Sequence, residues 1–130
     1  MKKQYIQISS GIVCVKDIIF MHDETEKYGG TIYISCHDKI TFGVPNSFFD
    51  RPDIEDVITK HFFVISLPST NSKLYVNKHN CYKLVCDGVI ELENGFYLKL
   101  SNHFTWENAL TITNKIITYI KECQSDKILK

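Results

Sequence analysis

The stretch that decides the fold is TIYISCHDKITFGVPNSFF, residues 31–49. Its apolar residues alternate with polar ones on both sides of a short polar HDK sequence. Alternation with period two is typical of a strand that has one buried face. A second stretch, VIELENGFYLKLSNHFT at residues 89–105, alternates in the same way around Asn94-Gly95. Because an Asn-Gly pair strongly favours a tight hairpin turn, and the HDK sequence also suits a turn, both stretches predict antiparallel β-hairpins.

The two hairpins occupy equivalent places in the two halves of the chain. A constant offset of 56 residues places Ile34 on Ile90 and Phe42 on Leu98. This likeness has two explanations, which the sequence leaves open: an internal duplication, or the chance agreement of two hairpins of similar length. A unit of about sixty residues buries little surface alone, so the chain of 130 residues is expected to form a single domain.

A helical pattern follows each hairpin, over residues 53–61 and over residues 105–122. The sequence therefore predicts an α+β fold with antiparallel β-sheets and a C-terminal helix at 105–122. The sheets come from two similar strand-strand-hairpin-helix halves, residues 5–61 and 62–122.

Charge and composition favour a protein partner over a nucleic acid. Lysine and arginine together number 15, as do aspartate and glutamate, so the formal net charge is zero. A nucleic-acid-binding domain is more often basic. Arg51 is the single arginine, although arginine is the side chain that best recognises phosphate and guanine edges.

Neither secretion nor membrane insertion is indicated by the sequence. The N-terminal MKKQYIQISSG has no apolar run after its lysines, as a signal peptide would. No window approaches the roughly 18 apolar residues of a membrane span. The five cysteines are an odd number without C-x-x-C spacing, which predicts free thiols. We expect a cytoplasmic protein with no membrane partner.

Candidate chemical groups are scattered rather than arranged in motifs. Cys36-His37-Asp38 and His79 with Cys81 offer metal ligands, but the tight cysteine pairs of zinc sites are missing. The sequence contains no G-x-S-x-G, H-E-x-x-H or P-loop spacing. His22-Asp23-Glu24 can be read as an acid–base group or as a solvated loop. We expect no cofactor, no metal and no catalytic activity.

The second half of the chain places basic residues among tyrosines, a pattern that suits a binding surface. The alternative is that these lysines keep the outer face and edges of a sheet soluble. The predicted binding residues are Tyr75, Asn77, Lys78, Tyr97 and Lys99. The acidic stretch Asp23–Lys27 is a second candidate surface. The small size and the composition of the chain suit an inhibitor or immunity-type protein that acts by protein–protein interaction.

Four segments resemble the LytTR-type DNA-binding domain, and the resemblance covers residues 12–104. They are VKDIIFM (15–21), DIEDVITKHFFVIS (53–66), LYVNKHNCYKL (74–84) and VIELENGFYLKLSNHF (89–104). HFFVIS, YVN and ENG are the most specific parts. Where that family carries arginine and histidine after the phenylalanine, this chain has Val64-Ile65-Ser66.

The resemblance implies an alternative function, that of a DNA-binding transcriptional regulator. The residues that would contact DNA by this likeness are Lys73, Asn77, Lys78, Lys99, Asn102 and His103. The C-terminal helix with Trp106 also resembles the end of a PH-like barrel, which two packed antiparallel sheets form.

Overall fold

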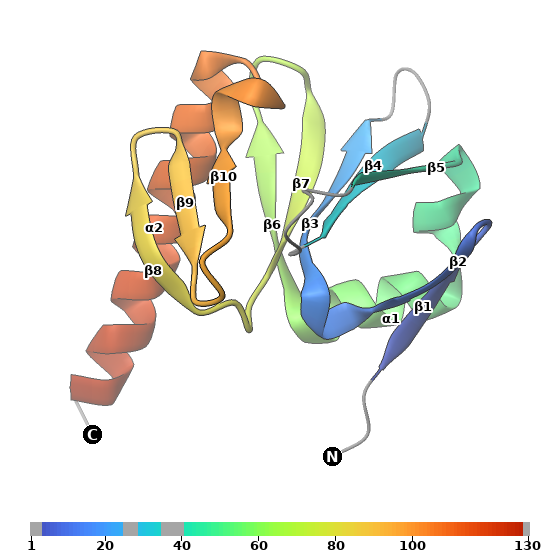
Figure 1. Ribbon diagram of the computed structural model, residues 1–130, viewed down its shortest axis with the longest axis horizontal. Helices are drawn as coiled ribbons and strands as arrows, with labels where there is room; N and C mark the ends of the chain where they lie inside the picture. The colour runs from blue at the N-terminus through green and yellow to red at the C-terminus, as the bar shows by residue number, and fades with distance from the viewer. Residues whose placement is uncertain (1–3, 25–28, 35–40, 129–130) are drawn as a thin grey trace. The chain divides into compact units, whose positions relative to one another are not determined.

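The computed structural model describes residues 4–24, 29–34 and 41–128. They form an α+β protein with antiparallel sheets of five, three and two strands, and two α-helices (Figure 1). The chain divides into two compact units. Unit 1 comprises Met1–Ser66 and Asn71–Cys81, and unit 2 comprises Leu67–Thr70 and Tyr82–Lys130.

Unit 1 contains the five-stranded sheet, in the order β5-β4-β3-β7-β6, and the separate β1–β2 hairpin. Its elements are β1 (Tyr5–Ile8), β2 (Gly11–Cys14), the 3-10 turn η1 (Val15–Asp17), β3 (Ile18–Glu24), β4 (Gly29–Ile34), β5 (Thr41–Val44), the 3-10 turn η2 (Asn46–Asp50), α1 (Pro52–His61), β6 (Phe62–Leu67) and β7 (Ser72–Asn77).

Helix α1 confirms the helix expected over residues 53–61. Pro52 fits the first turn, where its missing N–H costs nothing, and Asp53 and Glu55 complement the positive end of the helix dipole. Lys60 and His61 occupy the last turn, at the negative end. Ile54 and Val57 point into the core of unit 1.

The core of unit 1 joins the β1–β2 hairpin, the central strands and α1. Ile6 and Val13 come from the hairpin, Met21 and Ile32 from β3 and β4, and Ile54 from α1. All five side chains are buried. The two-residue period of the strands and the 3.6-residue period of α1 therefore direct apolar side chains to one interior.

β3 is the central strand of the five-stranded sheet and pairs antiparallel on both sides. Phe20 lies opposite Tyr33 of β4 and opposite Val76 of β7. β6 and β7 belong to the predicted second half, residues 62–122, yet they complete the sheet of unit 1. The unit boundary thus differs from the boundary of the predicted halves, because β7 pairs with β3 over a long sequence separation.

Unit 2 is a three-stranded sheet with one long helix, which lies behind the sheet in Figure 1. Its elements are β8 (Tyr82–Cys86), β9 (Val89–Leu92), β10 (Tyr97–Lys99), the 3-10 turn η3 (Leu100–Asn102) and α2 (Trp106–Ile128). Ile90 and Leu98 lie opposite each other across β9 and β10 and are buried, as are Ala109, Ile112 and Ile116 of α2. Leu100, at the start of η3, is also buried.

The C-terminal helix is longer than predicted and its first residue is not buried. We expected residues 105–122, whereas α2 runs from Trp106 to Ile128. Thr105 caps it as expected, because its hydroxyl accepts a hydrogen bond of 3.2 Å from the N–H of Asn108. Trp106 is 56% exposed and lies across Gly88 rather than in the core. The helix continues past residue 122 because no glycine or proline follows.

The two hairpins are present but their registers differ. Ile90 lies opposite Leu98, whereas Phe42 lies opposite Ile32 and not opposite Ile34. Residues related by the offset of 56 therefore lie on corresponding faces of their strands. Their partners on the neighbouring strand do not correspond. The HDK turn lies outside the described residues.

The polar sequence HDETEKYGG at residues 22–30 ends in two glycines and predicts a loop, and this prediction is wrong at both ends. β3 continues through Glu24, and β4 begins at Gly29. Strand pairing overrides the polarity here, since His22 lies opposite Thr31 and Leu74 and is 4% exposed. Residues 25–27 of the predicted acidic surface lie outside the described residues.

Candidate functional site

β8 lies at the edge of the three-stranded sheet, in the order β10-β9-β8. Among the described strands it pairs with β9 alone. An edge strand carries N–H and C=O groups on its free side that a further strand can pair with. The register shifts between Tyr82 and Leu84, which marks a bulge at Lys83.

A groove of about 300 Å³ lies between β8 and the C-terminal half of α2. Its lining residues from β8 are Tyr82, Lys83, Leu84 and Val85, and those from α2 are Ile117, Ile120, Lys121 and Gln124. Leu84 is 41% exposed, and Val85, Ile117 and Ile120 are half-buried. The groove thus offers apolar side chains beside the pairing edge of a sheet.

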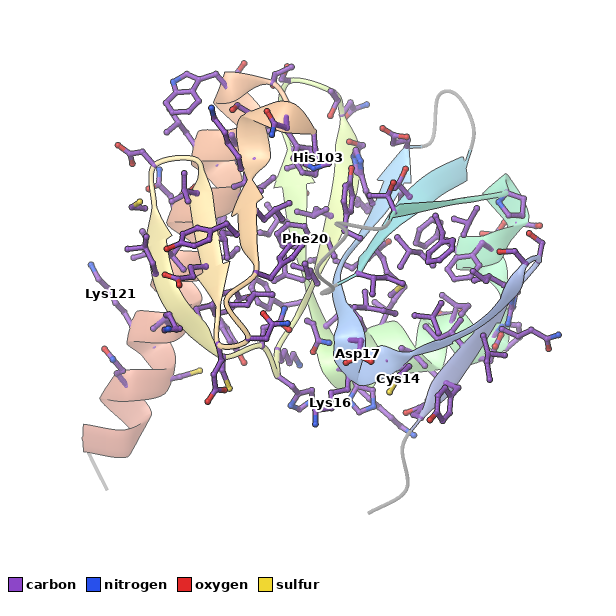
Figure 2. The ribbon with its side chains drawn as sticks, in the orientation of Figure 1. Cys14, Lys16, Asp17, Phe20, His103 and Lys121 are labelled. Atoms are coloured by element: carbon purple, nitrogen blue, oxygen red, sulfur yellow. The ribbon has the colours of Figure 1, made fainter. Side chains whose placement is uncertain are left out.

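The charge of the groove is positive. Lys83 and Lys121 are exposed, and the lining includes no carboxylate. Figure 2 shows Lys121 projecting outward from α2. Glu91 of β9 lies 3.8 Å from the ammonium of Lys83 and offsets part of that charge. The exposed lysines raise the local potential toward anionic groups while their stems add apolar surface.

Tyr97 and Lys99, two of the predicted binding residues, lie together on the exposed face of β10. Tyr97 is 52% exposed and lies opposite Glu91. The charge of Glu91, and a hydrogen bond with it, raise the pKa of the Tyr97 hydroxyl. The exposed ring of Tyr97 can stack on a partner.

Tyr75, Asn77 and Lys78 lie in unit 1, so the predicted surface is divided between the two units. Tyr75 is half-buried and stacks on Phe49, with 5.8 Å between ring centroids. Asn77 is fully buried. Its amide donates to the carbonyls of Val15 and Ile18, both at 3.0 Å, and its Oδ1 accepts from the N–H of His79 at 3.0 Å. Asn77 thus holds the fold of unit 1 together.

The residues that would contact DNA in the alternative function are also divided between unit 1 and unit 2. Lys73 lies on β7 opposite Asp23. Burial raises the pKa of the Asp23 carboxyl, and the charge of Lys73 opposes that rise. Lys99, Asn102 and His103 follow one another closely at the end of β10 and in η3, and all three are exposed. Figure 2 shows His103 at this end of unit 2.

A Ser-His-Glu arrangement lies at the end of β3 and the start of β7. His22 Nε2 is 2.9 Å from Ser72 Oγ, and His22 Nδ1 is 3.4 Å from Glu24 Oε1. Burial lowers the pKa of His22, although the charge of Glu24 raises it. His22 and Ser72 are 4% and 5% exposed, so a substrate does not reach the hydroxyl. The arrangement acts as a cross-strand hydrogen bond of a buried sheet.

The possible metal ligands named from the sequence are not clustered in the part of the chain that the structure describes. Over those residues no group of three or more histidine, cysteine, aspartate or glutamate side chains is placed to hold an ion. Cys14, Cys86 and Cys123 are free thiols, and Cys81 is exposed. Cys36-His37-Asp38 lies outside the described residues.

Sequence reasoning missed the β8–α2 groove. The spacing of the apolar residues in the C-terminal helix groups Ile117 and Ile120 with Ile116 on one apolar face. Only Ile116 of the three is fully buried, because Ile117 and Ile120 lie at the margin of the apolar stripe, where β8 ends the sheet. A signal was present in the unbroken apolar pair Leu84-Val85, which leaves one apolar side chain on the outer face.

Comparison of the chain with family models, with curated proteins and with solved structures found no significant match. Over the described residues, neither helix combines the length and the apolar character that a membrane crossing requires.

Proposed function

We propose that this chain is a non-catalytic, cytosolic binding protein whose β8 edge accepts an extended segment of a partner protein. Strand addition at an open edge supplies main-chain hydrogen bonds, and adjacent pockets select alternate side chains. The observation that carries the proposal is the apolar groove along β8, flanked by Lys83 and Lys121. The partner segment alternates apolar residues with aspartate or glutamate, because it must fill the groove and match its charge.

A second copy of this chain is a poorer occupant of the same edge. It would bring its own Lys83 and Lys121 to a groove that already carries these two lysines. Like charges that meet across paired strands are destabilising. An acidic partner segment meets no such repulsion.

The test is a binding titration with two labelled peptides. Both carry the same alternating apolar residues, and one has glutamate where the other has lysine between them. We expect saturable binding of the acidic peptide only. The double variant Lys83→Glu with Lys121→Glu should weaken this binding at least about tenfold, since reversing charges at a binding rim slows association and removes complementarity.

Lys115→Glu is the matched control, because Lys115 lies exposed on α2 but does not line the groove. It makes a charge change of the same sign on the same helix and should leave the affinity unchanged. Failure of the acidic peptide to bind at low ionic strength, or equal affinity for the groove variant and the wild type, would contradict the proposal.

The second candidate is a LytTR-like DNA-binding regulator. It is favoured by the sequence resemblance and by the exposed group Lys99, Asn102 and His103. A gel-shift titration at two salt concentrations tests it, because phosphate contacts make the affinity fall steeply as salt rises. The triple alanine variant of these residues should abolish the shift. No shift at low salt removes this candidate.

We further propose that the two hairpins arose by duplication of a hairpin-turn-helix segment. β4–β5 is followed by η2 and α1, and β9–β10 is followed by η3 and α2. This shared order of elements supports the proposal, whereas the difference in hairpin register opposes it. Sequences of relatives test it, since a duplication predicts that the two segments are more alike in some of them.

A further inference from the structure

Two histidines of unit 1 lie side by side, outside the surfaces described above. His61 ends α1, and His79 follows the end of β7. Their rings are 5.3 Å apart between centroids, and His61 Nδ1 is 3.2 Å from His79 Nε2. On the other side of the His61 ring, Nε2 is 3.0 Å from the side-chain oxygen Oε1 of Gln4.

Gln4 fixes which nitrogen of His61 carries the proton. An amide oxygen can only accept a hydrogen bond, so His61 Nε2–H donates to Gln4 Oε1. In neutral His61 the lone pair is therefore on Nδ1, which faces His79. A histidine that binds a metal almost always donates its other ring N–H to an acceptor of this kind, which orients the ring and sets its tautomer.

The separation of the two nitrogens suits a shared metal ion. A tetrahedral ion with bonds of about 2.0–2.1 Å to each imidazole holds the two nitrogens about 3.3 Å apart. The observed 3.2 Å is close to this value. Binding requires only that the proton on His79 Nε2 moves to His79 Nδ1 through solvent, so that two lone pairs converge.

Hydrogen bonds from the surrounding chain hold the pair in place. The N–H of Lys78 donates to the carbonyl of His61 at 2.8 Å. The buried Asn77 accepts from the N–H of His79 and donates to the carbonyl of Val15. The N–H of Val15 in turn donates to the carbonyl of Gln4 at 2.9 Å. These bonds form a closed ring, so both imidazoles are positioned before an ion arrives.

The surroundings of His61 shift its pKa downward. Burial lowers the pKa of His61, and the neighbouring His79 and Lys60 lower it further, against a smaller opposing effect of Asp56. Neutral imidazole is a good ligand for zinc, copper and nickel, and a poor one for magnesium and calcium.

We propose that His61 Nδ1 and His79 Nε2 form a two-histidine site for a divalent first-row transition ion, with Gln4 as the positioning residue. Water completes the coordination shell. The site lies wholly within unit 1 and does not depend on the proposed binding of a peptide at β8.

The experiment is a calorimetric titration of the folded protein with Ni²⁺ and with Zn²⁺, using Mg²⁺ as the negative control. It is made in a background where all five cysteines, Cys14, Cys36, Cys81, Cys86 and Cys123, are replaced by serine, so that thiolates do not bind the added ion. We expect one equivalent of Ni²⁺ or Zn²⁺ to bind and Mg²⁺ not to bind. His61→Ala and His79→Ala should each weaken the affinity at least about tenfold.

The control for the loss of a histidine is His103→Ala, because His103 is exposed in unit 2. It should bind the ion as the background protein does. Gln4→Ala should lose about tenfold in affinity, and Gln4→Glu should restore it, since a carboxylate also accepts from His61 Nε2–H. A residue that only stabilises the fold would not show this rescue.

Ring-nitrogen NMR gives a second readout that does not depend on any variant. The signals of His61 Nδ1 and His79 Nε2 should move on addition of Zn²⁺, while those of His103 stay. The proposal is overturned by a titration without saturable binding. It is also overturned by unchanged affinity in both His61→Ala and His79→Ala, with circular dichroism confirming that the variants are folded.

Discussion

Replacing Asn77 by alanine should strongly lower the free energy of unfolding of unit 1. The Asn77 side chain is fully buried and makes three hydrogen bonds, to the carbonyls of Val15 and Ile18 and from the N–H of His79. Truncation leaves these three backbone groups without that partner. At about 1–1.5 kcal/mol for each group, the free energy of unfolding should fall by about 3–4.5 kcal/mol.

Urea denaturation followed by circular dichroism measures this change. The midpoint should fall clearly, because a domain has only about 5–15 kcal/mol in total. Asn77→Asp sharpens the test, since a carboxylate still accepts from His79 but turns negative charge toward two carbonyl oxygens. That environment raises the folded-state pKa of the new carboxyl, so the stability of Asn77→Asp should increase as the pH falls toward that value. A loss of less than about 1 kcal/mol in Asn77→Ala would refute the assignment of Asn77 as a structural residue.

Three further predictions concern single buried contacts. Gly88→Ala should destabilise unit 2 by about 1–3 kcal/mol in urea denaturation, because Gly88 has φ +76° and an added Cβ would lie 2.8 Å from the ring of Trp106. Thr113→Val keeps the side-chain shape but removes the hydroxyl that accepts from the N–H of Gly88 at 3.1 Å, so it should cost about 1–3 kcal/mol; an unchanged midpoint would argue against that hydrogen bond. Because burial lowers the pKa of His22 below 6.5, the unfolded chain binds a proton more readily, and stability should fall as the pH drops from about 7 to 5. His22→Gln, which can still hydrogen-bond Ser72, should show a weaker pH dependence in the same assay, and an identical pH profile would contradict this assignment.

The local elements of the fold were predictable because their signals lie within short stretches. Alternating residues around Asn94-Gly95 place the β9–β10 hairpin, and Pro52 with Asp53 places the start of α1. The pairing of β7 with β3 was not predictable in this way. Their partners Val76 and Phe20 are far apart in sequence, and an apolar strand pattern does not specify which strand lies beside it.

Some residues of the candidate sites could also be predicted from the sequence, whereas others could not. Tyr97 and Lys99 were expected to be exposed from the alternation of β10, and they are. Asn77 was predicted as a binding residue, but its side chain is buried, because its amide donates to the carbonyls of Val15, at the start of η1, and Ile18, just past its end. The β8–α2 groove and the His61–His79 pair depend on residues brought together by tertiary structure, which no local pattern reveals.

The order of strands in unit 1 has a consequence for how the chain is made. β3 leaves the ribosome early, but its neighbour β7 is complete only when Asn77 has been synthesised. Until then the nascent chain displays one side of β3 as an open template on which another chain can nucleate aggregation. Unit 2 has no such delay, since over the residues that the structure describes its strands β8, β9 and β10 each pair with strands adjacent in sequence. We therefore expect β7 docking to limit the rate of refolding, and a trigger-factor-type chaperone to raise the yield of wild-type protein by shielding β3 during translation.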